Sequence, residues 1–310
     1  MLNVFVSATS FSKDERLRES ASSRFPNLKF NFCDPSTQWN EDALRSAIST
    51  ADYWIVGKEP VSAAVLASAV NLKGICKYGV GLDNVDFSAC EGRGIPFYFE
   101  AGVNSQEVAE QALSLMIALS RNLLSSSQEM GEGKWIKDGG RNFSGKTVAV
   151  IGCGHVGSKV ARLSRAFSCS VLVTDILDKS SFCEEIGASQ VSCEEALMQA
   201  DFISFHVPLT DETRSLISGD AFQLLKPGVI LVNTSRGEVI NLNDLKDNVD
   251  KGLVAGAALD VFEKEPFTDK SLFRHRNIYG TSHIAGNSQE AVWKMGQAAL
   301  NGLDKFLLDR

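Results

Sequence analysis

The feature that most constrains this chain is a short apolar run that leads directly into a spaced set of glycines. Residues 147–151 read Thr-Val-Ala-Val-Ile, and a helical pattern follows the glycines over residues 158–167. The glycines themselves are Gly152, Gly154 and Gly157. Glycine serves here in a tight turn, in close approach of backbone to a ligand, and in helix packing on a strand. The pattern predicts an α/β dinucleotide-binding domain that holds a pyrophosphate at the helix N-terminus.

The next expected strand, residues 171–174, ends at Asp175. In such domains an acid at this place accepts hydrogen bonds from the adenosine ribose. A carboxylate there also repels the extra phosphate of NADP, and no basic residue follows before Lys179. We therefore expect NAD as the cofactor, with NADP as the alternative. The glycine motif itself is expected to supply the cofactor contacts Gly152, Gly154, His155, Val156 and Gly157.

Short β-branched runs alternate with helix-length stretches in both halves of the chain. The runs cover residues 2–6, 53–56, 74–77, 147–151, 171–174, 202–205, 229–232 and 254–258. This alternation predicts two α/β units with parallel sheets. A helical pattern over 105–122 and a polar stretch over 131–144 lie between the units, and a last helical pattern covers 288–308.

Composition excludes several other classes of protein. With 310 residues the chain has room for about two domains, and its net charge of −7 gives no electrostatic footprint for nucleic acid or anionic lipid. No apolar stretch approaches the roughly 18 residues of a membrane span, and no secretory signal opens the chain. The seven cysteines are scattered and never spaced as a CxxC pair. We therefore expect free thiols, no metal site, and a cytoplasmic protein.

Further motifs occur in a fixed order along nearly the whole chain. They are residues 77–86 (Lys-Tyr-Gly-Val-Gly-Leu-Asp-Asn-Val-Asp), 108–110, 206–210 (His-Val-Pro-Leu-Thr), 233–237 (Asn-Thr-Ser-Arg-Gly), 258–262 (Ala-Leu-Asp-Val-Phe), Glu265 with Pro266, and 283–286 (His-Ile-Ala-Gly). With the glycine motif, they resemble the D-isomer-specific 2-hydroxyacid dehydrogenase family, and within it the members like D-3-phosphoglycerate dehydrogenase.

The resemblance implies two Rossmann-like domains. Residues 1–101 and 287–310 are expected to form a flavodoxin-like substrate domain, into which an NAD-binding doubly wound parallel sheet, residues 102–286, is inserted. It also implies an active site between the domains and a homodimer formed largely through the nucleotide domains.

Carried over to this sequence, the resemblance makes His283 the general acid/base, Glu265 its carboxylate partner and Arg236 the substrate clamp. The chemistry suits these side chains. Imidazole has an unperturbed pKa of about 6.5, suited to exchanging the hydroxyl proton as hydride leaves. A neighbouring carboxylate orients the ring and favours its protonated form. The planar guanidinium of Arg236 matches a carboxylate bidentately.

The remaining assignments also come from the resemblance. Substrate binding is expected from Lys77, Gly79, Val80, Gly81 and Arg236, and further cofactor contacts from Val108, Pro208, Thr213, Thr234, Asp260 and Gly286. A tight turn would explain the glycines at 79 and 81 almost as well. We expect His206 to be structural and His275 to lie on the surface.

The sequence leaves the substrate open. Lys77 stands where phosphoglycerate enzymes commonly carry arginine, and a second basic residue has no clean match near Val56 and Gly57, with Lys58 just beyond. Glyoxylate, hydroxypyruvate or another small 2-oxo acid therefore stands beside 3-phosphoglycerate. Two alternatives lie outside the hydroxy acids: a dinucleotide-sensing binding protein of the same fold, and an enzyme acting on formate or an inorganic oxyanion.

Overall fold

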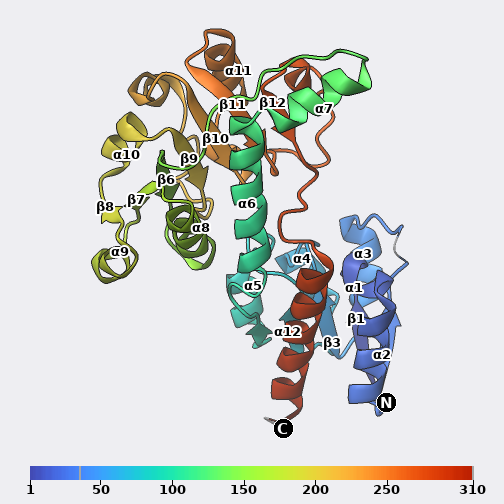
Figure 1. The fold of residues 1–310 in the computed structure, drawn as a ribbon. Helices are drawn as coiled ribbons and strands as arrows, with labels where there is room; N and C mark the ends of the chain where they lie inside the picture. The colour runs from blue at the N-terminus through green and yellow to red at the C-terminus, as the bar shows by residue number, and fades with distance from the viewer. Residues whose placement is uncertain (35, 309–310) are drawn as a thin grey trace. The chain divides into compact units, whose positions relative to one another are not determined.

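A computed structural model describes residues 1–34 and 36–308, and the chain divides into two compact units. Unit 1 consists of Met1–Asn104 and Asn287–Arg310, and unit 2 of Ser105–Gly286. Each is an α/β structure in which every paired strand is parallel, as the sequence predicts (Figure 1).

Unit 1 contains a five-stranded sheet with the order β2-β1-β3-β4-β5. Its strands are β1 (Leu2–Val6), β2 (Leu28–Phe32), β3 (Tyr53–Val56), β4 (Gly74–Lys77) and β5 (Phe97–Tyr98). Its helices are α1 (Thr9–Lys13), α2 (Glu15–Arg24), α3 (Glu41–Ile48), α4 (Ala63–Ala67), α5 (Phe87–Gly92) and α12 (Gln289–Leu308). This strand order is that of flavodoxin-like sheets.

Both faces of this sheet are buried, because successive side chains of a strand point to opposite faces. Along β3, Tyr53 and Ile55 pack with helices α1, α2 and α12, whereas Trp54 and Val56 pack with α3, α4 and α5. The strand therefore reads as an unbroken apolar run, which is typical of a parallel sheet covered on two sides.

Unit 2 contains a seven-stranded sheet with the order β12-β11-β10-β9-β6-β7-β8. Its strands are β6 (Thr147–Ile151), β7 (Ser170–Thr174), β8 (Ser189–Gln190), β9 (Phe202–Phe205), β10 (Val229–Asn233), β11 (Val254–Leu259) and β12 (Ile278–Gly280). Its helices are α6 (Ser105–Ser120), α7 (Leu123–Gly131), α8 (His155–Ala166), α9 (Ser180–Ile186), α10 (Cys193–Gln199) and α11 (Leu242–Asp250), with short 3-10 turns at Gly219–Leu224, Gly237–Val239 and Leu272–Arg274.

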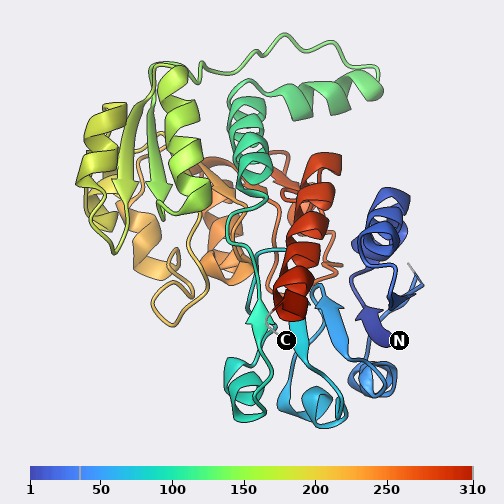
Figure 2. The same ribbon diagram turned by 90° about the horizontal axis from the view of Figure 1, so that it is seen from below.

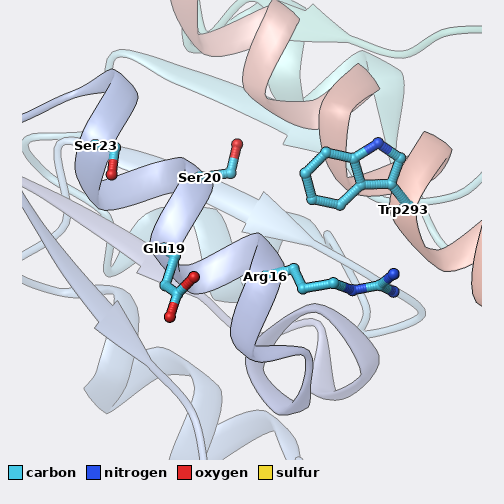
Figure 3. A pocket seen from close by; sticks show the side chains of 5 residues that line it. All are labelled: Arg16, Glu19, Ser20, Ser23 and Trp293. Carbon is cyan, nitrogen blue, oxygen red and sulfur yellow. The ribbon is translucent and has the colours of Figure 1, made fainter.

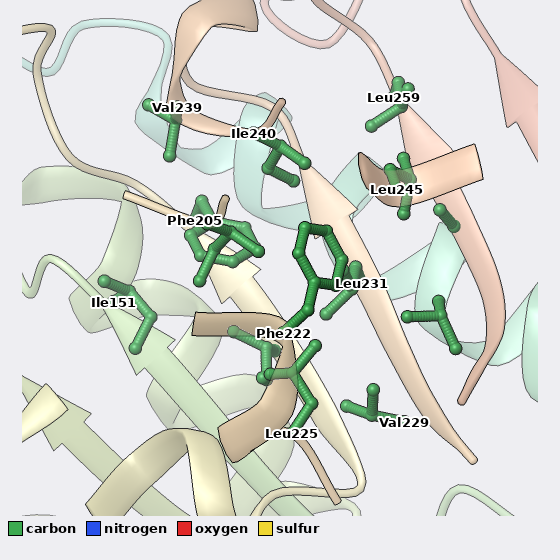
Figure 4. Packing of buried hydrophobic residues seen from close by; sticks show 14 of the residues in the cluster. Ile151, Phe205, Phe222, Leu225, Val229, Leu231, Val239, Ile240, Leu245 and Leu259 are labelled. Atoms are coloured by element: carbon green, nitrogen blue, oxygen red, sulfur yellow. The ribbon is translucent and has the colours of Figure 1, made fainter. Parts of the chain in front are cut away.

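The chain order reverses at β6, which pairs with β7 on one side and β9 on the other. Helices α6 and α8 cover one face of this sheet, and α10 and α11 cover the other (Figure 2). Figure 4 shows the core on the face that α10 and α11 cover, in which Phe205, Phe222 and Leu231 pack together. Ligands of open α/β sheets bind at the carboxyl ends of strands where the order reverses, so β6 marks that place in unit 2.

Several elements lie outside the sequence prediction. The strands β2, β5, β8 and β12 and helix α7 were not expected. Three of the four strands have only two or three residues, too few for a periodic pattern. Helix α7 begins beyond the expected helical pattern over 105–122, after Asn122, whose φ of +52° separates it from α6.

No helix of the described ranges combines the length and the apolar character that a bilayer crossing requires.

Candidate active site

The glycine turn after β6 leaves open space at one position and none at two others. A Cβ on Gly152, which has a φ of +90°, would lie 2.8 Å from the backbone of His206, and a Cβ on Gly157 would lie 1.9 Å from the carbonyl oxygen of Gly152. By contrast, nothing lies within 4 Å of a Cβ built on Gly154, the N-cap residue of α8. His155 is exposed beside it. This arrangement fits a pyrophosphate approaching the backbone at the start of a helix.

Asp175 lies at the carboxyl end of β7 and fastens two loops together. One carboxylate oxygen accepts the backbone N–H of Cys153, at 2.7 Å, and the other accepts the N–H of Leu177, at 2.9 Å. The residue thus joins the glycine turn to the loop after β7, and it remains partly exposed. Each carboxylate oxygen has a second lone pair, so ribose hydroxyls can still donate to Asp175.

His283 and Glu265 form a hydrogen-bonded pair. The Nδ1 atom of His283 lies 2.9 Å from Oε2 and 3.0 Å from Oε1 of Glu265. A carboxylate only accepts, so Nδ1 carries the proton in this pair and Nε2 is the nitrogen that remains to exchange one with a substrate. The histidine side chain is half-exposed while the glutamate is more buried. The pair therefore has the orientation of a general acid/base and its carboxylate partner.

Arg236 belongs to the same edge of the sheet. It follows β10, whereas Glu265 follows β11 and His283 follows β12, and these three strands are neighbours. A Cβ on Gly237, the next residue, would lie 2.1 Å from the carbonyl carbon of Phe262 and 2.3 Å from the nitrogen of Glu263. The backbone that carries Arg236 therefore lies directly against the segment that leads to Glu265.

Asp260 organises the loop that carries His283. Its backbone oxygen accepts the N–H of His283, and its carboxylate accepts the N–H groups of Ile284, at 2.9 Å, and Ala285, at 2.8 Å. His283 has a φ of +54°, and consecutive N–H groups around such a left-handed residue form a concave anion-binding nest. The side chain of Asp260 occupies this nest and is fully buried. A role of Asp260 at the nicotinamide stays a prediction.

Two of the expected residues, His206 and Thr234, carry buried polar atoms. Burial lowers the pKa of His206 to about 3, so its imidazole is neutral, and its Nε2 lies 2.9 Å from the hydroxyl of Ser204. The buried hydroxyl of Thr234 has no hydrogen-bond partner among residues 1–34 and 36–308. A buried polar group without a partner is costly, so a bound molecule that reaches Thr234 would gain from it.

The other expected cofactor contacts lie on separate parts of unit 2. Thr213 donates its hydroxyl proton to the carbonyl of Pro208, at 2.6 Å, so these two residues share one turn after β9. Val108 is nearly buried on α6, Val156 stands in the first turn of α8, and Gly286 ends unit 2.

The expected substrate-binding residues other than Arg236 lie in unit 1, after β4. Lys77 is buried, and its ammonium donates to the carbonyl of Gly57 and, at 2.8 Å, to the side-chain oxygen of Asn84. Gly79 has a φ of +107°, and it begins a half-exposed loop with Val80 and Gly81. Lys77 therefore ties this loop to the end of β3.

Another feature of unit 1 lies away from these residues. A shallow hollow of about 510 Å³ lies between α2 and α12, and Figure 3 shows Arg16 of α2 facing Trp293 of α12. The guanidinium carbon stands 5.8 Å from the ring centre. None of the expected site residues lines this hollow.

Within the described part of the chain, no cluster of three or more His, Cys, Asp or Glu side chains is suited to hold a metal ion. The seven cysteines are free thiols, and six of them are buried. His275 lies partly buried, 3.2 Å from Asp250.

Two residues of the site are not predicted from the sequence. Gln111 on α6 and Thr281 after β12 both contact Asp260. Gln111 lies one helical turn after Val108, in a segment whose pattern indicates only a buried helix face. Thr281 lies two residues before His283. Gln111 and Thr281 meet because the segment after β12 lies beside helix α6 at Asp260.

Residues 113–285 match the family model described as the NAD-binding domain of D-isomer specific 2-hydroxyacid dehydrogenases. This match covers most of unit 2, from within α6 to the loop that carries His283.

Among curated relatives, a glyoxylate reductase of Thermococcus litoralis is 35% identical over 257 residues, which cover 80% of this chain and 78% of that protein. A D-3-phosphoglycerate dehydrogenase of Archaeoglobus fulgidus is 39% identical over 83% of this chain, but the chain spans only 49% of that protein. Among solved structures, the D-lactate dehydrogenase of Aquifex aeolicus complexed with NAD and lactic acid superposes with a TM-score of 0.84 at 25% identity, covering 99% of this chain and 96% of that one.

Proposed function

Because the chain belongs to the D-isomer specific 2-hydroxyacid dehydrogenase family, we propose that it transfers a hydride between NAD and a small, unphosphorylated 2-oxo or 2-hydroxy acid. The pairing of His283 with Glu265, on loops adjacent to Arg236, carries this proposal. Glyoxylate and hydroxypyruvate are the substrates that we expect first.

In the proposed reaction NAD supplies the hydride-accepting ring. His283 takes the hydroxyl proton of the substrate at Nε2 during oxidation and returns it during reduction. Glu265 accepts a hydrogen bond from Nδ1–H and so stabilises the imidazolium that forms. Arg236 binds the substrate carboxylate through its planar guanidinium, which holds the C2 carbon at a fixed place.

The chain's own residues fit the cofactor along the carboxyl ends of the unit 2 strands. The open backbone at Gly154 and the first turn of α8 would hold the pyrophosphate, and Asp175 the ribose. The buried hydroxyl of Thr234, Pro208 and Thr213 are proposed as further contacts. In unit 1, the loop of Gly79, Val80 and Gly81 is proposed to bind the substrate carboxylate through backbone N–H groups.

The preference for an unphosphorylated acid rests on Lys77. Lys77 is the cation expected to attract a phosphate, yet its ammonium is buried and donates to the carbonyl of Gly57 and to Asn84. Lys58 is exposed, and a single exposed lysine gives a weak, salt-screened attraction.

Turnover of a panel of 2-oxo acids tests the proposal. We expect NADH oxidation with glyoxylate or hydroxypyruvate, at a kcat/KM at least about tenfold above that with phosphohydroxypyruvate, which corresponds to about 1.4 kcal/mol. A preference for the phosphorylated acid would contradict the assignment of Lys77. Tight NADH binding without any turnover would instead favour a sensor.

Asp175 is expected to set the cofactor preference. Replacing it with alanine removes the negative charge that disfavours the phosphate of NADP, so the ratio of kcat/KM for NADH over NADPH should fall by about tenfold or more. Asp175→Asn, which keeps one accepting oxygen, should show the same change of preference with less loss of NADH affinity. Asp178→Ala, which removes a nearby acid that accepts the backbone N–H and the hydroxyl of Ser180, is the control. An unchanged ratio in Asp175→Ala would refute the role.

We also propose that the protein is a cytoplasmic homodimer formed through unit 2. Helix α7 and the loop after it expose four large apolar side chains: Leu123, Met130, Trp135 and Ile136. Exposed apolar side chains gathered on one segment are typical of protein interfaces. The seven free thiols suit a reducing compartment. Light scattering should give twice the mass of the chain, and a monomer would contradict the dimer.

A further inference from the structure

We propose that Gln111 on helix α6 is a positioning residue for His283, acting through Thr281 and Asp260. The inference rests on the proposed role of His283 as the acid/base. Gln111 contacts Asp260 and Thr281, so any effect on His283 passes through these two residues. This role also gives helix α6 a part in the chemistry beyond covering the sheet.

The contacts of Gln111 are specific. Its amide nitrogen lies 3.1 Å from Oδ1 of Asp260 and 3.1 Å from the hydroxyl oxygen of Thr281. The nitrogen of an amide has two protons, so these two acceptors use both of them. The orientation of the amide follows from chemistry as well, because a carboxylate only accepts and the amide oxygen would repel it.

This arrangement sets the direction of the next hydrogen bond. Thr281 has one hydroxyl proton, and its oxygen lies within hydrogen-bond distance of Oδ1 of Asp260. Since Gln111 donates to that oxygen, the proton of Thr281 turns toward the carboxylate. The result is a directed chain from Gln111 through Thr281 to Asp260, and hydrogen bonds in such chains strengthen one another.

The chain ends at the backbone of the acid/base. Oδ1 of Asp260 accepts from Gln111, Thr281 and the N–H of Ile284, while Oδ2 accepts the N–H of Ala285. His283, between Thr281 and Ile284, has a φ of +54°, a conformation that disfavours side chains other than glycine. A residue held in such a conformation depends on its surroundings to keep it there. Gln111 supplies the side-chain contacts to this loop from outside the β11–β12 segment.

The consequence for catalysis concerns the position of Nε2 of His283 relative to the substrate proton. Glu265 fixes Nδ1 of His283 from one side, and the nest fixes its backbone from the other. If the carboxylate of Asp260 rotates, the N–H groups of the nest lose their acceptor and Nε2 moves from the line of proton transfer. Displacements of about 1 Å can cost about a hundredfold in rate, whereas the pyrophosphate and ribose contacts proposed at the glycine turn and Asp175 lie outside this loop.

Kinetics of Gln111→Ala test the proposal. We expect kcat for the 2-oxo acid to fall about tenfold, with the Kd for NADH within about twofold of the unaltered enzyme. Gln106→Ala is the matched control, because Gln106 lies on the same helix and its amide donates to Glu110 on the exposed face. An unchanged kcat in Gln111→Ala, or equal losses in the two variants, would overturn the proposal.

Gln111→Glu gives a readout that simple packing would not change. At neutral pH its carboxylate faces Asp260 and cannot donate, whereas the protonated acid donates one hydrogen bond, and the neighbouring charge raises the pKa of the new side chain. The ratio of its kcat to that of the unaltered enzyme should therefore rise as the pH falls. A ratio independent of pH would contradict the donor role.

Hydrogen exchange separates this inference from the proposed function. The amides of Ile284 and Ala285 should exchange about tenfold faster in Gln111→Ala, but not in Gln106→Ala. Absence of turnover in the unaltered protein would refute the proposed function, while unchanged exchange in Gln111→Ala would refute the positioning role by itself.

Discussion

Replacing His283 with alanine should lower turnover of the 2-oxo acid by about 10²- to 10⁴-fold, the range that general acid–base catalysis contributes. The imidazole is the group paired with Glu265 and the one that exchanges the substrate proton in the proposed mechanism. The cofactor contacts proposed for the glycine turn and Asp175 do not involve it. Fluorescence titration should therefore give a Kd for NADH close to that of the unaltered enzyme.

His275→Ala is the control for this prediction. His275 pairs with Asp250 and has no part in the proposed site, so its loss should leave kcat within about twofold. If His283→Ala kept most of the activity, or if it lost NADH binding together with turnover, the assignment of His283 as the acid/base would be wrong.

Replacing Gly237 with alanine should lower kcat by about a hundredfold. The new Cβ would fall 2.1 Å from the carbonyl carbon of Phe262 and 2.3 Å from the nitrogen of Glu263, and backbone atoms cannot turn aside as a flexible side chain does. The segments that carry Arg236 and Glu265 must therefore separate. Displacement of catalytic groups by about 1 Å can cost this much in rate.

The same substitution should lower the free energy of unfolding by about 1–3 kcal/mol, the usual cost of overpacking. Gly92→Ala is the matched control, because nothing lies within 4 Å of a Cβ at Gly92. Circular dichroism and NADH binding establish that Gly237→Ala is folded. Full activity in the folded variant would show that the two segments are not as close as described.

The parts of the site predicted from sequence are those that depend on local geometry. The glycine turn after β6 needs its residues for steric reasons, and at Gly157 the crowding atom belongs to Gly152, five positions away, so the spacing is visible along the chain. The acid at the end of β7 was predicted from its place after the next expected strand. The family resemblance indicated Arg236, Glu265 and His283, and the neighbouring positions of β10, β11 and β12 explain why they lie at one edge of the sheet.

The rest depends on contacts between distant segments. Lys77 was expected to bind the substrate, and its burial against Gly57 and Asn84 arises from the packing of β3 and β4. Asp260 was expected as a cofactor contact, and its four side-chain hydrogen bonds arise where β11, β12 and α6 meet. The edge strands β8 and β12 are too short for any periodicity.

Deuterium transfer from the cofactor to the product tests the central claim most directly. The protein would be incubated with a 2-oxo acid and with NADH that carries deuterium at both C4 positions of the nicotinamide, and the product examined by mass spectrometry and chiral chromatography. A substrate with three or more carbons, such as hydroxypyruvate, gives a product with a stereocentre at C2 whose configuration can be determined. Hydride transfer predicts a D-2-hydroxy acid with deuterium on C2. An unlabelled product, or one of the L configuration, would contradict the account.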